Sequence, residues 1–361
     1  MSTSIAVPVR VTPKDTAARR RAWRWAAVYL ARRLGVFLLS VWGAFTITFI
    51  FVHLIPGDPV EAYINRLVDA GGPTLEVTQK LIEAYKKDMG YDGTIFEQYW
   101  RYLYNVIIRW DFGISFVAYP KPAQDLIFRA MPYTIGLLAT AVIISWALGL
   151  VVGAMLAWTR GGWFSWLMVN VAIVVSHMPF FFMSFLLLLM LGYGLAVLPT
   201  RGAYDVLTTP GLNLEFISGL LKHAILPAGS LVLVSASGWI LSTRAVVIGV
   251  LGEDYLLFAE AKGLPRLRIL LRHILRNALL PQVTALGISL GFVVNGSYLV
   301  EWIFAYPGVG MLFVQAASLR DLNVMQGVVL MSVFAVLFAN LIVDLTLPLL
   351  DPRVLQGGRG R

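Results

Sequence analysis

Six long apolar runs constrain this chain more strongly than any other feature of its sequence. A helix needs about 20 apolar residues to cross a hydrocarbon core about 30 Å thick. Runs of that length or slightly longer recur along most of the sequence. They predict an all-α polytopic membrane protein with about six transmembrane helices, at residues 34–55, 133–158, 164–191, 226–249, 280–303 and 325–349.

The composition agrees with a protein whose main solvent is lipid. Of the 361 residues, 58% are hydrophobic and only 14% are charged, whereas a soluble domain carries about 25% charged residues. The net charge is +9, which in a soluble protein would suggest a nucleic-acid partner. Because Lys and Arg accumulate on the cytoplasmic side of membrane proteins, we interpret this excess as topology and expect no nucleic-acid partner.

The basic residues also predict the orientation. Eight of the 29 Lys and Arg residues lie in residues 1–33, ahead of the first apolar run, and others gather in 250–281 and 350–361. Placing these segments inside satisfies the positive-inside rule, so we expect both termini on the cytoplasmic side of the cell membrane. The run 34–55 has full spanning length and lacks a small-residue cleavage site, which predicts an uncleaved first span.

These patterns divide the chain into segments. We expect a basic cytoplasmic N-terminal arm (1–33), a first transmembrane helix (34–55), an external helical insertion (56–132), a core of five transmembrane helices (133–349) and a cytoplasmic tail (350–361).

The external insertion carries two helical patterns. Thr74 is a suitable cap for the first, and an amphipathic aromatic stripe from Phe96 to Ile107 predicts the second. Two interpretations remain open. The insertion is either a small cap packed on the membrane domain or a docking surface for an external partner.

The cytoplasmic segment 250–281 contains a short helix with clear boundaries. Asp254 is a reasonable N-cap for a helix over 255–262, Gly263 is placed to cap its C-terminus, and Pro265 prevents its continuation. Because a two-turn helix is only marginally stable alone, packing against other residues must order it. We expect it to expose an apolar patch beside two small residues: Leu256, Leu257 and Phe258, with Ala259 and Ala261.

A second helix follows in the same segment. Arg268, Arg272 and Arg276 recur every four residues while apolar residues face elsewhere, a pattern typical of a helix at the membrane surface. We expect this helix to enter the bilayer at Pro281. From the residues alone, the segment is either an interfacial basic loop touching anionic lipid or a capped helix presented to a cytoplasmic partner.

Several short motifs occur in order along the chain. In the cytoplasmic segment they are Asp254-Tyr255, Ala259-Glu260-Ala261-Lys262-Gly263-Leu264, Arg272-His273 and Arg276-Asn277-Ala278-Leu279-Leu280-Pro281. Elsewhere they are Pro56-Gly57-Asp58-Pro59, Met89-Gly90-Tyr91-Asp92, Gln98-Tyr99, Asp111-Phe112-Gly113-Ile114-Ser115, Glu301-Trp302-Ile303-Phe304, Pro307-Gly308-Val309-Gly310 and Asp351-Pro352-Arg353. Together they resemble ABC importer permeases of the dipeptide, oligopeptide and nickel group, whose EAA motif corresponds to the cytoplasmic segment.

The chain departs from that group at three places. Met89-Gly90-Tyr91-Asp92 replaces the usual Gly-Leu-Asp, and Asp111-Phe112-Gly113 replaces Asp-Leu-Gly. The basic arm 1–33 is also longer than is usual. The external changes leave the substrate open, and none of them affects the cytoplasmic motif.

The resemblance implies that the short cytoplasmic helix is a coupling helix, which docks into a groove of an ATPase subunit. Glu260 and Lys262 would set its register by charge, and the small alanines would allow close approach. The implied coupling residues are Asp254, Tyr255, Leu257, Phe258, Ala259, Glu260, Ala261, Lys262, Gly263, Leu264 and Pro265.

The resemblance also implies several partners. These are a second homologous permease subunit forming a heterodimer, two cytoplasmic ATPase subunits, an extracellular or periplasmic substrate-binding protein, and membrane lipid. No lysine in this chain follows glycine and precedes serine or threonine, as a phosphate-binding loop requires. We therefore expect no catalytic residue and no cofactor in this chain, with ATP and Mg²⁺ bound by the ATPase.

Few polar groups lie in the predicted spans. His177, Asn295 and Glu301 are weak candidates for the translocation path, because polar residues in a membrane are costly and often functional. The chain has no cysteine, and its four histidines lack metal-ligand spacing. The scarcity of buried carboxylates argues against an ion-coupled secondary transporter, which stays the alternative from a different class.

The sequence constrains the identity of the substrate less than it constrains the type of transporter. The resemblance favours import of di- or oligopeptides, and the same group includes transporters of oligosaccharides, glutathione-like peptides and nickel. The polar residues named above do not discriminate among these substrates.

Overall fold

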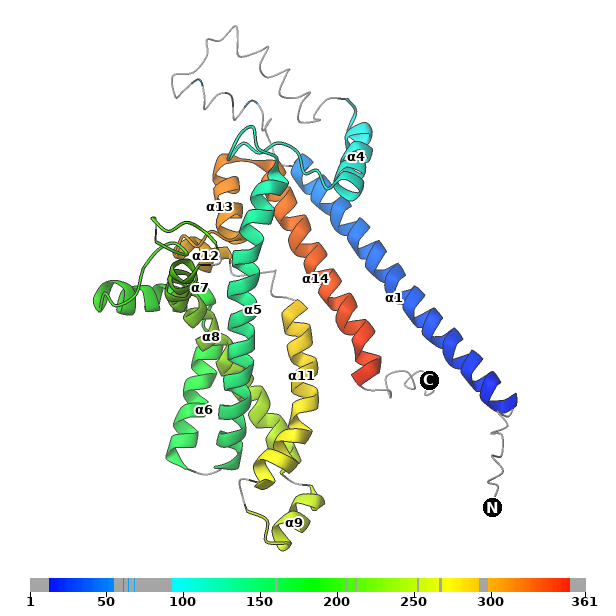
Figure 1. Ribbon diagram of the computed structural model, residues 1–361, viewed down its shortest axis with the longest axis vertical. Helices are drawn as coiled ribbons and strands as arrows, with labels where there is room; N and C mark the ends of the chain where they lie inside the picture. Colours follow the sequence, from blue (N-terminus) through cyan, green and yellow to red (C-terminus); the bar gives the residue numbers. More distant parts are fainter. Residues whose placement is uncertain are drawn as a thin grey trace, which may run out of the picture.

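A computed structural model describes most of the chain as helices (Figure 1). The described residues are 13–54, 93–159, 162–205, 207–211, 213–251, 253–265, 268–291 and 298–350, with 61, 64 and 68 as single positions. The helix predicted to begin at Thr74 lies outside these residues. Among them there is no strand, and the β-type pairing is an isolated bridge between Ile114 and Pro122. An all-α fold is therefore confirmed.

The elements follow one another in a simple order, with π-helical turns labelled η. They are α1 (Pro13–Leu54), α4 (Ile95–Tyr104), η1 (Asn105–Arg109), α5 (Ala123–Trp158), α6 (Trp163–Ser176), α7 (Phe180–Leu187), η2 (Leu188–Gly194), α8 (Leu214–Val250), α9 (Asp254–Ala261), η3 (Ile269–Ile274), α11 (Leu275–Gly291), α12 (Tyr298–Ile303), α13 (Val309–Leu319) and α14 (Leu322–Leu350).

Four of the described helices are long and apolar enough to cross a membrane, and the count is five if the bent pair α6 and α7–η2 is taken as one broken span. The four lie at Val28–Phe51, Ala123–Trp158, Leu214–Val250 and Leu322–Ile342, each overlapping a predicted span. The polytopic architecture is thus confirmed. The first helix also continues back to Pro13, because the Ala- and Arg-rich residues before the span favour a helix.

The third predicted span, 164–191, is wrong as a single helix. Its two halves, Trp163–Ser176 and Phe180–Gly194, meet at an angle of 108°. The break lies at Pro179, whose backbone is extended (φ −59°, ψ 140°). Proline has no N–H to continue the helical hydrogen bonds, and here it divides the span rather than kinking it slightly.

The fifth predicted span, 280–303, also differs from the structure. α11 begins earlier, at Leu275, and its described part ends at Gly291 after 17 residues. Pro281 lies inside this helix and not at its start. Proline is tolerated inside a membrane helix when other groups satisfy the freed carbonyl, so the surface helix and the predicted span are joined without a break at Pro281.

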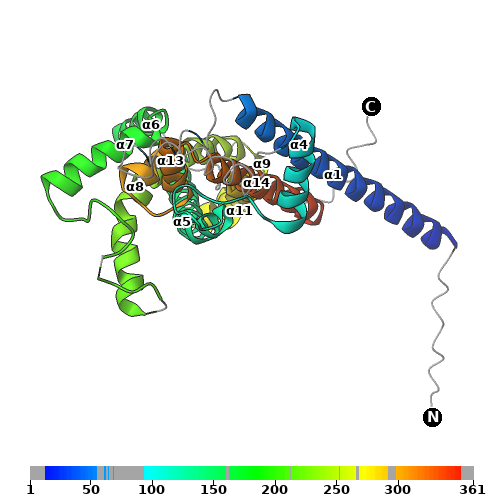
Figure 2. The same cartoon turned by 90° about the horizontal axis from the view of Figure 1, so that it is seen from above.

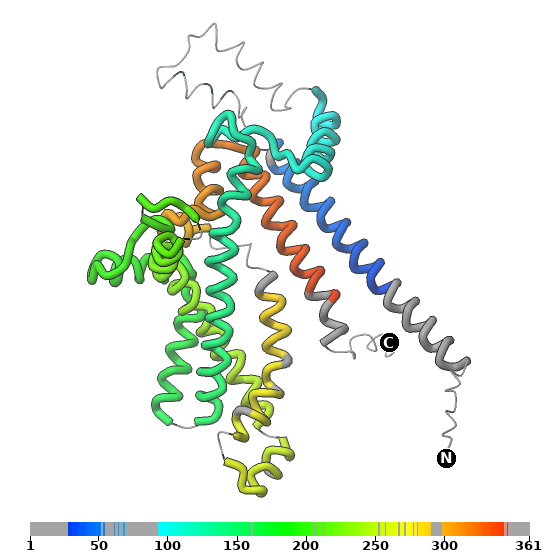
Figure 3. Tube along the Cα trace, viewed as in Figure 1, coloured from blue at the N-terminus to red at the C-terminus, as the bar shows by residue number. Residues whose placement is uncertain are grey.

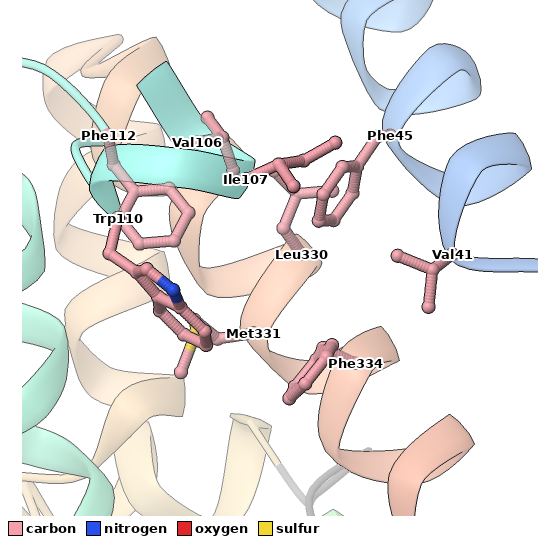
Figure 4. A pocket seen from close by; sticks show the side chains of 9 residues that line it. All are labelled: Val41, Phe45, Val106, Ile107, Trp110, Phe112, Leu330, Met331 and Phe334. Atoms are coloured by element: carbon pink, nitrogen blue, oxygen red, sulfur yellow. The ribbon is translucent and has the colours of Figure 1, made fainter. Parts of the chain in front are cut away.

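The helices form a central bundle with α1 at its side. α5 and α8 lie at the centre with α6 and α11 beside them, while α1 contacts α14 (Figures 1 and 2). Among the candidate spans, α1 is the least buried within this chain. Its contact with α14 is apolar: Phe45 of α1 and Leu330 and Phe334 of α14 line a cavity of about 90 Å³ together with Trp110 (Figure 4).

Two glycines allow α5 and α8 to approach closely. Gly149 and Gly153 form a Gly-x-x-x-Gly pattern on α5, the arrangement that brings membrane helices together. A Cβ on Gly149 would lie 2.1 Å from Cβ of Trp239, and one on Gly153 would lie 2.6 Å from the backbone oxygen of Ile240. Only a residue without a side chain fits at either position, so the two helices pack as one unit.

Candidate functional site: the short helix at one end of the bundle

Helix α9 lies beyond the ends of α5, α6 and α11, at the opposite end of the bundle from α4 and α13 (Figures 1 and 3). Glu253 is its N-cap, with extended backbone (φ −81°, ψ 138°) and no side-chain capping bond. The prediction that Asp254 is the N-cap is therefore wrong by one residue. Asp254 is instead the first helical residue, where its negative charge is favoured by the helix dipole.

The other end of α9 is closed by two backbone hydrogen bonds. The N–H of Gly263 donates to the carbonyl of Glu260 at 2.9 Å, and that of Leu264 donates to the carbonyl of Ala259 at 3.3 Å. This pair is a Schellman motif, and it places Gly263 at φ +69°. An added Cβ would meet no atom within 4 Å, so glycine is needed for its conformation and not for space. The predicted end at Gly263 and Pro265 is confirmed.

One face of α9 is buried against the membrane helices. Leu256 is 4% exposed and Ala259 is also buried. They belong to an apolar cluster, here called the inner joint, which gathers residues from α5, α8, α9, η3 and α11: Ala154, Ala157, Val247, Leu256, Ala259, Ile269, Leu270, Ile274 and Ala278. The prediction that Leu256 is exposed is wrong, because packing on this cluster is what orders so short a helix.

The opposite face of α9 is open. Phe258 is 63% exposed, and Tyr255 is also exposed. The Nζ atom of Lys262 lies 4.6 Å from the centre of the Phe258 ring, a cation–π arrangement that orients both side chains. The exposed residues also include Asp254, Glu260, Ala261, Gly263 and Pro265, while Leu264 is half-buried. The helix backbone at Leu257 is described but its side chain is not.

The basic residues after α9 lie on the outside of a continuous helical stretch. Arg268, Arg272 and Arg276 are exposed, whereas Ile269 and Ile274 are fully buried in the inner joint. The intervening turn is the π-helix η3, which widens the helix locally. The predicted division into a basic face and an apolar face is confirmed.

The three predicted path residues are not brought together. His177 is exposed at the bend after α6, with its Nδ1 2.7 Å from the carbonyl of Ile173. Asn295 lies outside the described residues. Glu301 is 1% exposed, and its carboxylate accepts a hydrogen bond from the N–H of Gly310 at 2.6 Å. That bond ties α12 to the start of α13 and supports a structural role for Glu301.

A second organised region lies at the other end of the bundle, and sequence reasoning did not find its key residue. The carboxylate of Asp321 accepts hydrogen bonds from the hydroxyl of Ser115 at 2.7 Å, from the N–H of Val117 at 2.9 Å and from the N–H of Val324 at 3.1 Å. The N–H of Phe116 donates to the same carboxylate. We call this group the outer clamp, after the outward orientation that the positive-inside rule predicts for this end of the bundle. The residues that donate to Asp321 begin at Ser115, shortly after Asp111-Phe112-Gly113. That motif was the feature of the sequence that could have indicated this region.

Asn323 extends the outer clamp. Its side-chain amide donates to the carbonyl of Ile114 at 2.8 Å. Gly113 has a positive φ of +88°, and a Cβ there would lie 2.8 Å from the Asn323 amide nitrogen. The Asp-Phe-Gly-Ile-Ser motif thus holds the segment before α5 against the start of α14.

Comparison with known proteins agrees with this architecture. The family described as binding-protein-dependent transport system inner membrane component matches residues 149–356. The glutathione transport system permease protein GsiC of Escherichia coli (strain K12) is 32% identical over 326 residues, which cover 90% of this chain and 98% of that protein. The protein of the same name from Pectobacterium atrosepticum is 33% identical over 329 residues, with the same coverage of both chains.

Proposed function

The chain belongs to the family of binding-protein-dependent transport system inner membrane components, the permeases of ABC importers, and from this premise we propose that α9 is its coupling helix. In such an importer the ATPase is a separate subunit and the permease forms the path across the inner membrane. The proposal therefore concerns which residues of this chain receive the movement of the ATPase, and what crosses the membrane as a result.

The observation that carries the proposal is the two-sided packing of α9. Its buried face, with Leu256 and Ala259, packs on η3 within the inner joint, to which α5, α8 and α11 also contribute residues. Its open face presents Phe258 and Tyr255, aromatic residues of the kind enriched where proteins bind one another. A helix that binds a partner on one face and the spans on the other is placed to transmit displacement between them.

Helix α9 would transmit the movement of the ATPase by shifting as a rigid body. The Schellman motif fixes the end of the helix, so a force on Phe258 moves the whole element rather than unwinding it. Val247 of α8 and Ala157 of α5 belong to the same inner joint as the buried residues of α9. Because the glycines on α5 lock these two helices together, they would tilt as a unit and change access to the path between permeases.

The charged residues on the open face would set the register of docking. Lys262 is held over Phe258, and Glu260 and Asp254 are exposed on the same short helix. Exposed charges of this kind add specificity more than affinity. The groove that receives α9 would be apolar at its centre with charged groups at its rim.

The orientation follows from the same assignment. An ATPase is cytoplasmic, so the α9 end of the bundle faces the cytoplasm. The Pro13 end of α1 lies toward that same end (Figure 1), as expected if the basic arm is inside. The outer clamp and α4 then face outward, where a substrate-binding protein would deliver substrate, and a second permease subunit would complete the path as a heterodimer.

We propose that the substrate is a peptide. The relatives named above are called glutathione transport permeases, and glutathione is a short peptide. The motifs of the chain resemble the group that imports di- and oligopeptides. Oligosaccharides and nickel are the alternative cargoes, and neither has a particular residue of this structure in its favour.

Gly263→Val tests the coupling role most simply. A β-branched residue is strained at φ +69°, so the Schellman motif would open and α9 would lose its fixed end. In proteoliposomes holding the complete transporter, we expect ATP hydrolysis to continue while peptide uptake falls at least about tenfold, the effect of about 1.4 kcal/mol lost from the coupling step.

Gly249→Val is the matched control. Gly249 lies in the last turn of α8, has no positive φ, and likewise has open space where a Cβ would be added. Uptake should stay near the wild-type level in this variant. Equal effects of the two substitutions, or normal coupled uptake by Gly263→Val, would show that α9 is not the coupling element.

A further inference from the structure

A cavity of about 610 Å³ opens near the outer end of the bundle, away from the inner joint. Its walls come from the start of α5, from α13 with the loop before it, and from the segment around Tyr204. Cavities of about 300–1,000 Å³ are the usual size of small-molecule sites. Nothing in the coupling role of α9 requires this cavity.

Arg129 is the charged residue among those lining the cavity. It lies on the second turn of α5 and is exposed. No carboxylate of the described residues forms an ion pair with it. A guanidinium group that lines a cavity without a carboxylate partner among the described residues is available to an anion from outside.

The rest of the lining suits a small organic molecule. The rings of Tyr133 and Tyr204 stack at 6.4 Å with an angle of 27° between them, and both residues line the cavity together with Gln315. Aromatic faces with a few polar groups are typical of sites that bind organic ligands. Two phenol groups and an amide add hydrogen-bonding capacity beside the charge of Arg129.

The charge of Arg129 discriminates among the three classes of substrate, which are peptides, oligosaccharides and nickel. A guanidinium pairs with a carboxylate through two parallel hydrogen bonds. A peptide carries a free carboxylate at its C-terminus, whereas an oligosaccharide is usually neutral and a nickel ion is repelled by a fixed positive charge. The lining of this cavity therefore favours the peptide over both alternatives.

We propose that this outer cavity is a substrate subsite, in which Arg129 binds the carboxylate of the peptide as it leaves the binding protein and starts across the membrane. Tyr133, Tyr204 and Gln315 complete the subsite. The inference rests on the proposed function, since it assumes that the chain imports peptides. It adds a specificity-determining residue that lies far from the coupling helix.

Uptake by the complete transporter in proteoliposomes tests the role of charge. With binding protein saturated by a peptide that has a free C-terminal carboxylate, Arg129→Gln should lower the maximal uptake rate about tenfold, as loss of a charge-assisted hydrogen bond predicts. Arg129→Lys should lose less, because the charge is kept. The same peptide with an amidated C-terminus should be taken up equally by wild type and Arg129→Gln.

Arg109→Gln is the matched control. Arg109 is also an exposed arginine on the outer side, but it packs over the ring of Tyr104 and does not line the cavity. The transporter that carries Arg109→Gln should take up both peptides at the wild-type rate. If Arg129→Gln lowers uptake of the two peptides equally, or of neither, the subsite is wrong.

A second measurement does not depend on transport of the amidated peptide. The chain has no cysteine, so Gln315→Cys places a single thiol in the cavity wall. Peptide-loaded binding protein should slow the reaction of this thiol with an impermeant maleimide. The protection should disappear when Arg129→Gln is added and persist with Arg109→Gln. Equal protection in both backgrounds would contradict the role of Arg129.

These outcomes separate the two proposals. If the wild-type transporter imports peptide and Arg129→Gln behaves as wild type in both assays, only the subsite fails. If the wild-type transporter loaded with peptide imports none, the proposed peptide cargo fails and the subsite fails with it.

Discussion

The two ends of this bundle are held together by different interactions. At the outer clamp, the carboxylate of Asp321 accepts four hydrogen bonds, three of them from the segment before α5. At the inner joint, Leu256 and Ala259 of α9 pack on η3 in an apolar cluster that also includes residues of α5, α8 and α11. The outer end is thus fixed by directional bonds to a buried charge, and the inner end by contacts without direction.

This difference agrees with a permease that moves at one end. A hydrogen bond weakens steeply when its angle or length changes, so the outer clamp resists displacement of α14 relative to α5. Apolar contacts depend on the area buried and hardly on direction, so α9 can change its angle while its buried face stays packed on the inner joint. The bundle therefore has a stiff end and a compliant end, joined by the tightly packed pair α5 and α8.

The largest effect is expected from breaking the connection between the two ends. In Gly149→Val the new side chain would overlap Trp239 on α8, and overpacking of this severity costs about 3 kcal/mol or more. We expect little monodisperse protein in size-exclusion chromatography. Gly136→Val, on the same helix with open space at its Cβ, should elute normally. Similar behaviour of the two variants would mean that α5 and α8 do not act as a unit.

Asp321→Asn tests the outer clamp and should have the next largest effect. The amide keeps the shape of the side chain but turns one acceptor into a donor facing N–H groups, at a cost of about 3 kcal/mol. The melting temperature of the purified complex should fall, while the ratio of peptide imported to ATP hydrolysed stays constant. Asp125→Asn, on an exposed outer residue, should melt as wild type does. A changed ratio would assign the outer end a part in coupling.

Leu256→Ala tests the inner joint. Removing this buried side chain should cost about 2 kcal/mol, at the low end for core leucines because the site is at the end of the bundle. We expect a smaller fall in melting temperature than for Asp321→Asn, together with a clear fall in peptide imported per ATP. Leu207→Ala, on a side chain that is 96% exposed, should change neither value. The comparison fails if Leu256→Ala lowers stability but leaves coupling intact.

Phe258→Ala should have the smallest effect on stability. Its ring is mostly exposed in this chain, so truncation should change the unfolding free energy by no more than about 0.5 kcal/mol. Binding of the ATPase should weaken at least about tenfold, as for a central aromatic residue of an interface. Titration of the ATPase onto nanodiscs measures this. Phe164→Ala, an exposed phenylalanine at the start of α6, is the control and should bind normally.

Much of this architecture was predictable from the sequence, for identifiable reasons. The long apolar runs and the Gly263-Leu264-Pro265 stop depend on local rules, so four of the predicted spans and the end of α9 were correctly predicted. A local break at Pro179 was predicted, but its 108° angle was not, nor was the continuous helix through Pro281, because the effect of a proline depends on which neighbouring groups satisfy the freed carbonyl.

Contacts between residues far apart in the sequence were the other features that the sequence did not predict. Ser115 and Asp321 are 206 residues apart, and no periodicity connects them. Leu256 was placed on the wrong face because its neighbours in the inner joint come from helices far away in the sequence. Arg129 was not selected for the same reason: only the fold brings it beside Tyr204 and Gln315.

The most direct test of the account asks whether Phe258 touches the ATPase. Phe258→Cys gives a chain with one thiol, which a short bifunctional reagent can join to a lysine of a bound partner. The account predicts cross-linking to the ATPase subunit that changes in yield when ATP is bound, and much less cross-linking from Trp163→Cys on α6, where the native side chain is 76% exposed. A freely reactive thiol at position 258 with no cross-link to the ATPase, in a complex that still imports peptide, would contradict it.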